Sequence, residues 1–267
     1  MNNTSGRGKA GPLRAMTVLK GVFSIRFAPK PKTALTLCLG TLSVVSSFAM
    51  VLAPGKVSSI FLRDVLQIGI LGLLLPAFLM GRGDRLEFGL RFRKWPAPFA
   101  AGLILTALFA TIFYLEDPEA LAAGIKTSWS AVAYIMAANV FEIVFFFAFL
   151  RGSLERAFGI IPAILIAAAA YSLHHAGFQP EFGKLFIVGL VFMTMYRIAG
   201  HWLLMFPLWW LCALWDVLFQ AEKIGDIDAI GPLRPAIVLA FIAAATIIAA
   251  REFMADQDRS DIVIELR

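Results

Sequence analysis

The chain has 267 residues, of which 60% are hydrophobic and only 16% are charged, and its mean hydropathy is +0.79. These values exclude an ordinary soluble domain and predict a polytopic membrane protein. We expect an all-α fold, a membrane helical bundle of about eight transmembrane helices, because each span needs roughly 20 residues. The net charge of +6 is concentrated near the N-terminus, as expected for a topology signal, so no nucleic-acid partner is predicted.

Residues 1–32 contain seven basic residues and no acidic residue, the pattern of a cytoplasmic tail. Eight apolar segments follow, and each is predicted to be a membrane helix: 33–53, 64–81, 97–115, 129–150, 160–175, 184–200, 202–221 and 233–250. They form one transmembrane domain, 33–250, before a C-terminal tail at 251–267. The loop 82–95 is basic and the loop 116–127 is acidic, so the first is expected to be cytoplasmic. Alternation then places both termini in the cytoplasm, and we expect a bacterial inner membrane.

Small residues in the apolar segments bear on how the helices pack. The run Ala167 to Ala170 removes side-chain bulk from one helix turn, which predicts close approach of a neighbouring backbone. Cys38 and Cys212 both lie within apolar segments, so we expect no disulfide framework.

Three polar sites interrupt the apolar segments. Glu142 lies inside the segment 129–150, where a carboxylate must find a partner or stay protonated. The pair His174 and His175 closes another segment, and Asp216 lies inside a third. Three polar sites on three membrane helices predict one shared cavity.

Each of these sites has a polar neighbour on the same helix face, at a spacing of three or four residues. The pairs are Asn139 with Glu142, Tyr171 with His175, and Cys212 with Asp216. A buried carboxylate and an imidazole can together activate water for attack on a carbonyl group. We therefore expect Glu142, His175 and Asp216 to face one centre, with Asn139, Tyr171, His174 and Cys212 around them.

The stretch Phe141-Glu142-Ile-Val-Phe-Phe146, continued by Leu154-Glu155-Arg156, resembles the first motif of a family of intramembrane endopeptidases. This is the CAAX-protease and bacteriocin-processing family, also called the ABI family. Its first motif is two glutamates followed, after three residues, by Arg-Gly. The resemblance implies a membrane helical bundle that hydrolyses peptide bonds with a glutamate and a histidine acting on water.

Two further motifs of the family follow in the same order. Tyr171 and His175 are similar to its second motif, a Phe followed four residues later by His. Cys212 and Asp216 are similar to its third, a His followed four residues later by Asn or Asp. The resemblance covers about residues 128–220 and implies Glu142 as the base, His175 as its partner or oxyanion stabiliser, and Asp216 as the orienting residue.

Three positions depart from the family pattern. The first glutamate is Phe141, the arginine is Phe146 and the third-motif histidine is Cys212. A phenylalanine ring cannot accept a proton, carry a charge or orient a water molecule. The pattern therefore leaves two functions open. One is an intramembrane endopeptidase acting on a membrane-associated peptide; the other is a non-catalytic relative that binds a membrane-protein partner as an assembly factor, immunity protein or subunit.

Structural alternatives stay open for the same residues. Glu142 could be a structural carboxyl group bonded to Asn139 or His175, and His174 is expected to cap its helix at the membrane interface. An interfacial position is also expected for a tryptophan cluster at Trp209, Trp210 and Trp215. One Glu, one His and one Asp are too few to predict a metal site, so no metal or cofactor is expected.

Contact between Glu142 and His175 places a condition on the fourth helix. If this helix crosses the membrane from Trp129, Glu142 lies roughly 20 Å along it, far from the end of the fifth helix. A helix that starts later and continues through Arg151 to Phe158 would move Glu142 toward His175.

Overall fold

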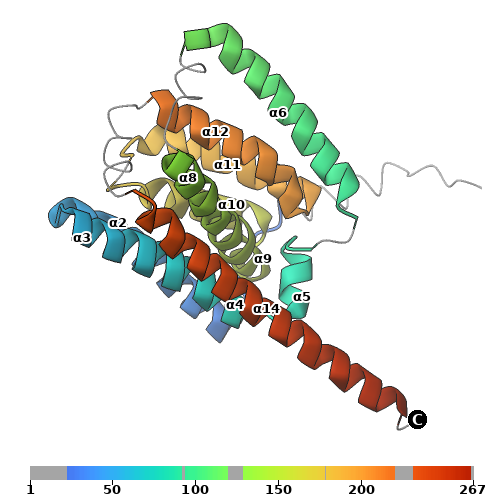
Figure 1. Cartoon of the computed structure of the whole chain (residues 1–267). Helices are drawn as coiled ribbons and strands as arrows, with labels where there is room; N and C mark the ends of the chain where they lie inside the picture. Colours follow the sequence, from blue (N-terminus) through green and yellow to red (C-terminus); the bar gives the residue numbers. More distant parts are fainter. Residues whose placement is uncertain (1–22, 92–93, 120–128, 178, 220–230, 266–267) are drawn as a thin grey trace, which may run out of the picture.

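The computed structural model describes residues 23–91, 94–119, 129–177, 179–219 and 231–265. Over these ranges the chain is helical and has no β-strand, which confirms the predicted all-α bundle (Figure 1). Six helices are long and apolar enough to cross a membrane, and two shorter apolar helices, Ile160–Leu173 and Trp202–Asp216, accompany them. Each of the eight predicted segments is thus helical over most of its described residues, as expected of a membrane protein.

The first half of the chain contributes six of the described helical segments. Its helices are α2 (Pro31–Leu52), α3 (Lys56–Ser59), η1 (Ile60–Leu74), α4 (Leu75–Leu79), α5 (Arg82–Glu87) and α6 (Pro96–Glu116). The second half contains α8 (Trp129–Glu142), η2 (Ile143–Leu150), α9 (Arg151–Phe158), α10 (Ile160–Leu173), α11 (Phe182–Ala199), η3 (Trp202–Leu204), α12 (Met205–Phe219) and α14 (Leu233–Glu265). Winding is π-helical in η1 and η2, and η1 joins α3 and α4 into one span.

The helix at the centre of the bundle runs without a break from Trp129 to Phe158 through α8, η2 and α9. The continuation through Arg151 to Phe158 is confirmed, but the later start is not, because α8 already begins at Trp129. Its phenylalanines lie in the core, and four of them are at most 2% exposed: Phe141, Phe145, Phe146 and Phe147. Since lipid tails are as apolar as these rings, close packing rather than escape from water stabilises this core.

Close packing of α10 on α11 confirms the prediction made from the alanine run. Ala167 and Ala168 are fully buried. A Cβ atom added to Gly189 of α11 would lie 3.2 Å from the Cβ of Ala168, so the two backbones approach closely. Small residues on both helices make this approach possible.

Two long helices lie at the edges of the bundle (Figure 1). Gly102 is the only buried residue of α6, and a Cβ there would meet the Leu204 carbonyl. The last helix, α14, extends well past residue 250 to Glu265, so most of the segment predicted as a tail, 251–267, is helical. Pro235 lies in its first turn, where the missing amide hydrogen is tolerated, and no Gly or Pro follows it in the helix. Of the predicted N-terminal tail, residues 1–22 lie outside the described residues, and α2 already begins at Pro31.

A buried ion pair ties three helices together. Arg234 of α14 binds Asp64 of η1 through Nε at 2.6 Å and Nη2 at 2.9 Å. Tyr134 of α8 donates its hydroxyl to the same carboxylate at 2.5 Å and accepts from Arg234 at 2.8 Å. All three residues are at most 4% exposed. Every charge in the group has a partner, which makes its burial tolerable.

Loss of one partner from this group should destabilise the bundle strongly. Asp64→Ala leaves the Arg234 guanidinium buried without its counter-ion, and we expect a loss of about 3–5 kcal/mol in the free energy of unfolding. Asp64→Leu combined with Arg234→Met should cost much less, because no buried charge remains. Unfolding in mixed detergent micelles measures the free energy of unfolding of both variants. If the double variant lost the sum of the two single losses, Asp64 and Arg234 would not act as a pair.

Candidate functional site

Glu142 lies where the winding of the central helix changes. It is the last residue of α8, and the π-helical η2 begins at Ile143. A π-helical turn is wider than an α-helical turn and changes the direction in which nearby side chains point, and such turns are frequent at functional sites. The Glu142 residue is 7% exposed, so its carboxylate needs partners inside the bundle.

Those partners come from the turn that follows α10. His174 and His175 are the first two residues after Leu173, and both are buried. The Nδ1 atoms of both rings lie against the carbonyl oxygen of Tyr171, at 2.9 Å for His175. Because a carbonyl oxygen only accepts, each imidazole carries a hydrogen on Nδ1 and turns Nε2 away from Tyr171.

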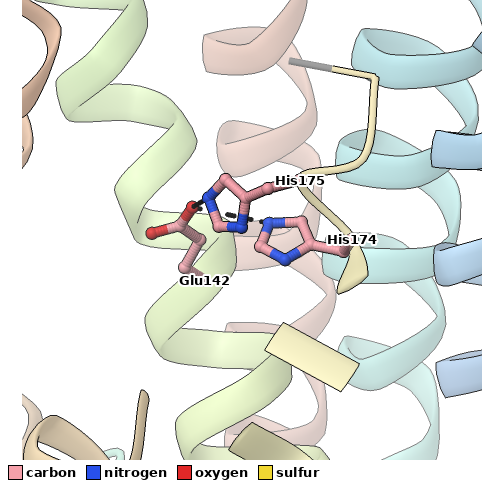
Figure 2. Close-up of side chains that lie close together, drawn as sticks. All are labelled: Glu142, His174 and His175. Carbon is pink, nitrogen blue, oxygen red and sulfur yellow. Dashed lines mark ion pairs between the residues drawn. The ribbon is translucent and has the colours of Figure 1, made fainter. Parts of the chain in front are cut away.

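Both Nε2 atoms point at one oxygen of Glu142 (Figure 2). His175 Nε2 lies 3.4 Å from Oε1, and His174 Nε2 lies 3.5 Å from the same atom. The other oxygen, Oε2, accepts a hydrogen bond from the indole of Trp209 at 2.9 Å. Residues from three helical segments thus converge on one carboxylate.

A cavity of about 530 Å³ opens beside this cluster and confirms the predicted shared cavity. Six of the predicted site residues line it: Asn139, Glu142, Tyr171, His175, Cys212 and Asp216. His174 is not part of this lining. The cavity wall also carries exposed charged residues, Glu181 and Lys184 among them, whereas Glu142 and His175 are buried.

Asn139 is the least satisfied polar residue of the cavity. It is 4% exposed, and its side-chain nitrogen has no hydrogen-bond partner within the described part of the chain. Of the two partners considered for Glu142, the structure brings His175 rather than Asn139 to the carboxylate. An amide group facing a cavity with two free hydrogens is available to a ligand oxygen.

Asp216 lies on the cavity wall, but its carboxylate is bonded to residues other than the two histidines. Gln179 donates to it, and Lys184 Nζ lies 2.5 Å from its Oδ1. The bond that orients His175 comes from the Tyr171 carbonyl, so the geometry gives Asp216 no direct part in holding that ring. Cys212 also lines the cavity, and among the described residues no hydrogen bond joins it to either histidine.

The two phenylalanines at motif positions pack around the histidines. The ring centre of Phe146 lies 4.4 Å from the ring centre of His174, and the ring centre of Phe141 lies 5.8 Å from it. Phe141 also lies against Gly72 of η1, so closely that a side chain there would meet the ring. An apolar wall therefore closes one side of the cluster.

Two predictions about individual residues were wrong. His174 occupies the C-cap position of α10, but it is not an interfacial residue, because it is 4% exposed and contacts Glu142. Trp209 is not an interfacial anchor, because it is 3% exposed and donates to the same carboxylate. A tryptophan is compatible with both environments, because its indole has an apolar body and one polar hydrogen, so the sequence could not distinguish them.

Two residues that support the site were not predicted. Ser47 of α2 and Gln67 of η1 both donate to the carbonyl oxygen of His174, and Gln67 also donates to Ser47 at 2.9 Å. These bonds attach the histidine turn to two other helices. A serine or glutamine in a membrane helix is a weak signal by itself, because such residues often bond within their own helix or across an interface.

A scan against models of protein families found no match to this chain, and neither did searches of curated proteins and of solved structures.

The bond from Trp209 to Glu142 should couple the two residues energetically. Trp209→Phe keeps most of the ring but removes the donor from a buried carboxylate, and we expect a loss of about 1–3 kcal/mol in unfolding free energy. In a double-mutant cycle with Glu142→Leu, the interaction should exceed about 0.5 kcal/mol. Trp210→Phe is the matched control, because that indole donates to the Met136 carbonyl instead. Equal coupling for both tryptophans would show that the bond is not specific.

Proposed function

We propose that this protein is a membrane-embedded hydrolase of the kind its motifs resemble, an intramembrane endopeptidase. The observation that carries the proposal is the convergence of two imidazole Nε2 atoms on Glu142 Oε1 at the wall of a cavity. Acid, base and cavity are the minimum that hydrolysis of an amide bond requires. Phe141 and Phe146 replace two ionisable residues of the family motif. His174 supplies an additional polar group at Glu142.

Water activation follows from the orientation of the acceptors. Glu142 Oε1 and His175 Nε2 are both acceptors when the imidazole is neutral, so they would take the two hydrogens of one water molecule. The oxygen lone pairs of that water then face the cavity. Glu142 accepts a proton as the oxygen attacks the substrate carbonyl carbon, and the proton passes to the departing amine.

Asn139 is placed to stabilise the negative charge that develops on the carbonyl oxygen. Its amide lies one helix turn before Glu142, lines the same cavity and has a nitrogen without a partner among the described residues. A donor already in position for a developing oxyanion contributes more than one that must reorganise.

The cavity supports a membrane-associated peptide as substrate. Its wall combines apolar residues such as Phe109 and Phe192 with exposed charged residues such as Lys184 and Glu181. Such a wall suits a chain that carries both an apolar group and polar backbone. We place the protein in a bacterial inner membrane with both termini in the cytoplasm, in contact with the lipid bilayer.

A second candidate function is binding without catalysis, as an assembly factor, immunity protein or subunit of a membrane complex. It is favoured by the packing of Phe141 and Phe146 against His174, which fills space that two ionisable residues would occupy in the family motif. In this case Glu142 and the histidines hold the helices together, and the cavity receives part of a partner.

Comparison of membrane proteomes distinguishes the two functions. Cells producing the wild type should contain new peptide N-termini that disappear with Glu142→Gln or His175→Ala, because each change removes a water acceptor; the rate should fall by about 10²–10⁴. Asn139→Leu should lower it by about 10²–10³. Cys212→Ser, on the same cavity wall, should leave cleavage intact.

The alternative predicts a different outcome of the same experiment. Identical N-termini in cells with wild type and Glu142→Gln, together with a stoichiometric protein partner that copurifies with both, would refute hydrolysis. Size-exclusion elution in detergent shows whether Glu142→Gln and His175→Ala remain folded. If both fail to fold, Asn139→Leu and Cys212→Ser provide the comparison.

A further inference from the structure

The cluster around Glu142 brings together three atoms that accept and none that donates to the space between them. Both imidazoles use their Nδ1 hydrogens on the Tyr171 carbonyl, so neutral rings direct bare Nε2 lone pairs at Glu142 Oε1. All three acceptor atoms lie within 4.8 Å of one another. Lone pairs that face each other in a buried site repel unless a donated hydrogen or a cation lies between them, and a cation can satisfy all three at once.

We propose that Glu142, His174 and His175 bind a divalent transition-metal ion, Zn²⁺, whose fourth coordination position faces the cavity. Two ligands at 2.0–2.1 Å from a tetrahedral zinc lie about 3.3–3.4 Å apart. The two separations between Glu142 Oε1 and the histidine Nε2 atoms are 3.4 and 3.5 Å. Two histidines, one glutamate and an open position form a ligand set found in catalytic zinc sites.

Groups behind the three ligands support the assignment. A histidine that binds a metal almost always donates its other ring hydrogen to a carbonyl or carboxylate, and both rings here donate to Tyr171. Glu142 Oε2 is occupied by the indole of Trp209, which leaves Oε1 as the ligand atom. Ser47 and Gln67 hold the His174 carbonyl, so the turn that carries both histidines is attached on its far side as well.

The donor types favour zinc over other ions. Calcium and magnesium prefer six or more oxygen ligands, whereas this site offers two nitrogens and one oxygen. Cys212 is not part of the group. Ferrous iron also binds two histidines and a carboxylate, but it needs further open positions on one face. Phe146 and Phe141 close one side of this cluster, which suits the smaller coordination number of zinc.

This inference concerns the proposed hydrolytic site but does not require hydrolysis. A zinc ion here makes Glu142 a ligand, and the metal takes over activation of the water. Zinc without cleavage would refute the proposed function alone. Cleavage by a protein that contains no zinc would refute the zinc site alone.

The test is metal analysis of the full-length protein purified in detergent without chelator. We expect about one zinc per chain in the wild type by elemental mass spectrometry. After removal of bound metal, titration with ZnCl₂ against a competing chromophoric chelator gives the affinity. His174→Ala and His175→Ala should each weaken zinc binding by at least about tenfold, the smallest effect expected even for an outer partner of a ligand.

A matched control uses the remaining histidine of the chain. His201 is buried as well, lies outside the cluster and accepts a backbone hydrogen bond from Leu203, so His201→Gln should keep the zinc. Iron in place of zinc would overturn the choice of metal. A wild-type protein that holds no metal and binds ZnCl₂ no more tightly than His175→Ala would overturn the site, whatever the folding of the variants.

Discussion

Burial of the Glu142 carboxylate inside an apolar helix bundle sets the requirements that the surrounding structure meets. A carboxylate at this depth is tolerated only when both oxygens have partners. Trp209 supplies a donor to one oxygen, and two histidine rings face the other. Both rings are turned toward Glu142 by a single carbonyl oxygen, that of Tyr171.

The bundle holds these partners in place from several directions. Ser47 and Gln67 attach the histidine turn to α2 and η1, and small residues bring α10 close to α11. A second buried group, Asp64 with Arg234, ties η1 and α14 to the central helix through Tyr134. Helices in lipid gain little from burial of apolar surface alone, so such polar contacts and close packing determine their arrangement.

The fold and much of the site could be predicted because a membrane leaves few options. Hydropathy locates the helices, and an ionisable residue such as Glu142 in an apolar run indicates a polar cluster. What could not be predicted was pairing across helices. Asp64 lies at the start of its segment and Arg234 near the start of another, so both resemble interfacial residues until the fold brings them together. Trp209 and His174 were misplaced for the same reason, because the sequence does not show which side chains of neighbouring helices turn toward Glu142.

The central claim is that one carbonyl orients both histidines toward Glu142, and histidine tautomers test it most directly. The chain contains only three histidines, so nitrogen NMR of protein labelled with isotopic histidine resolves each ring, and His174→Ala and His175→Ala assign the signals. The account predicts that both rings carry hydrogen on Nδ1, with that hydrogen bonded to a carbonyl oxygen. A ring at position 174 or 175 that is protonated only on Nε2 would contradict it.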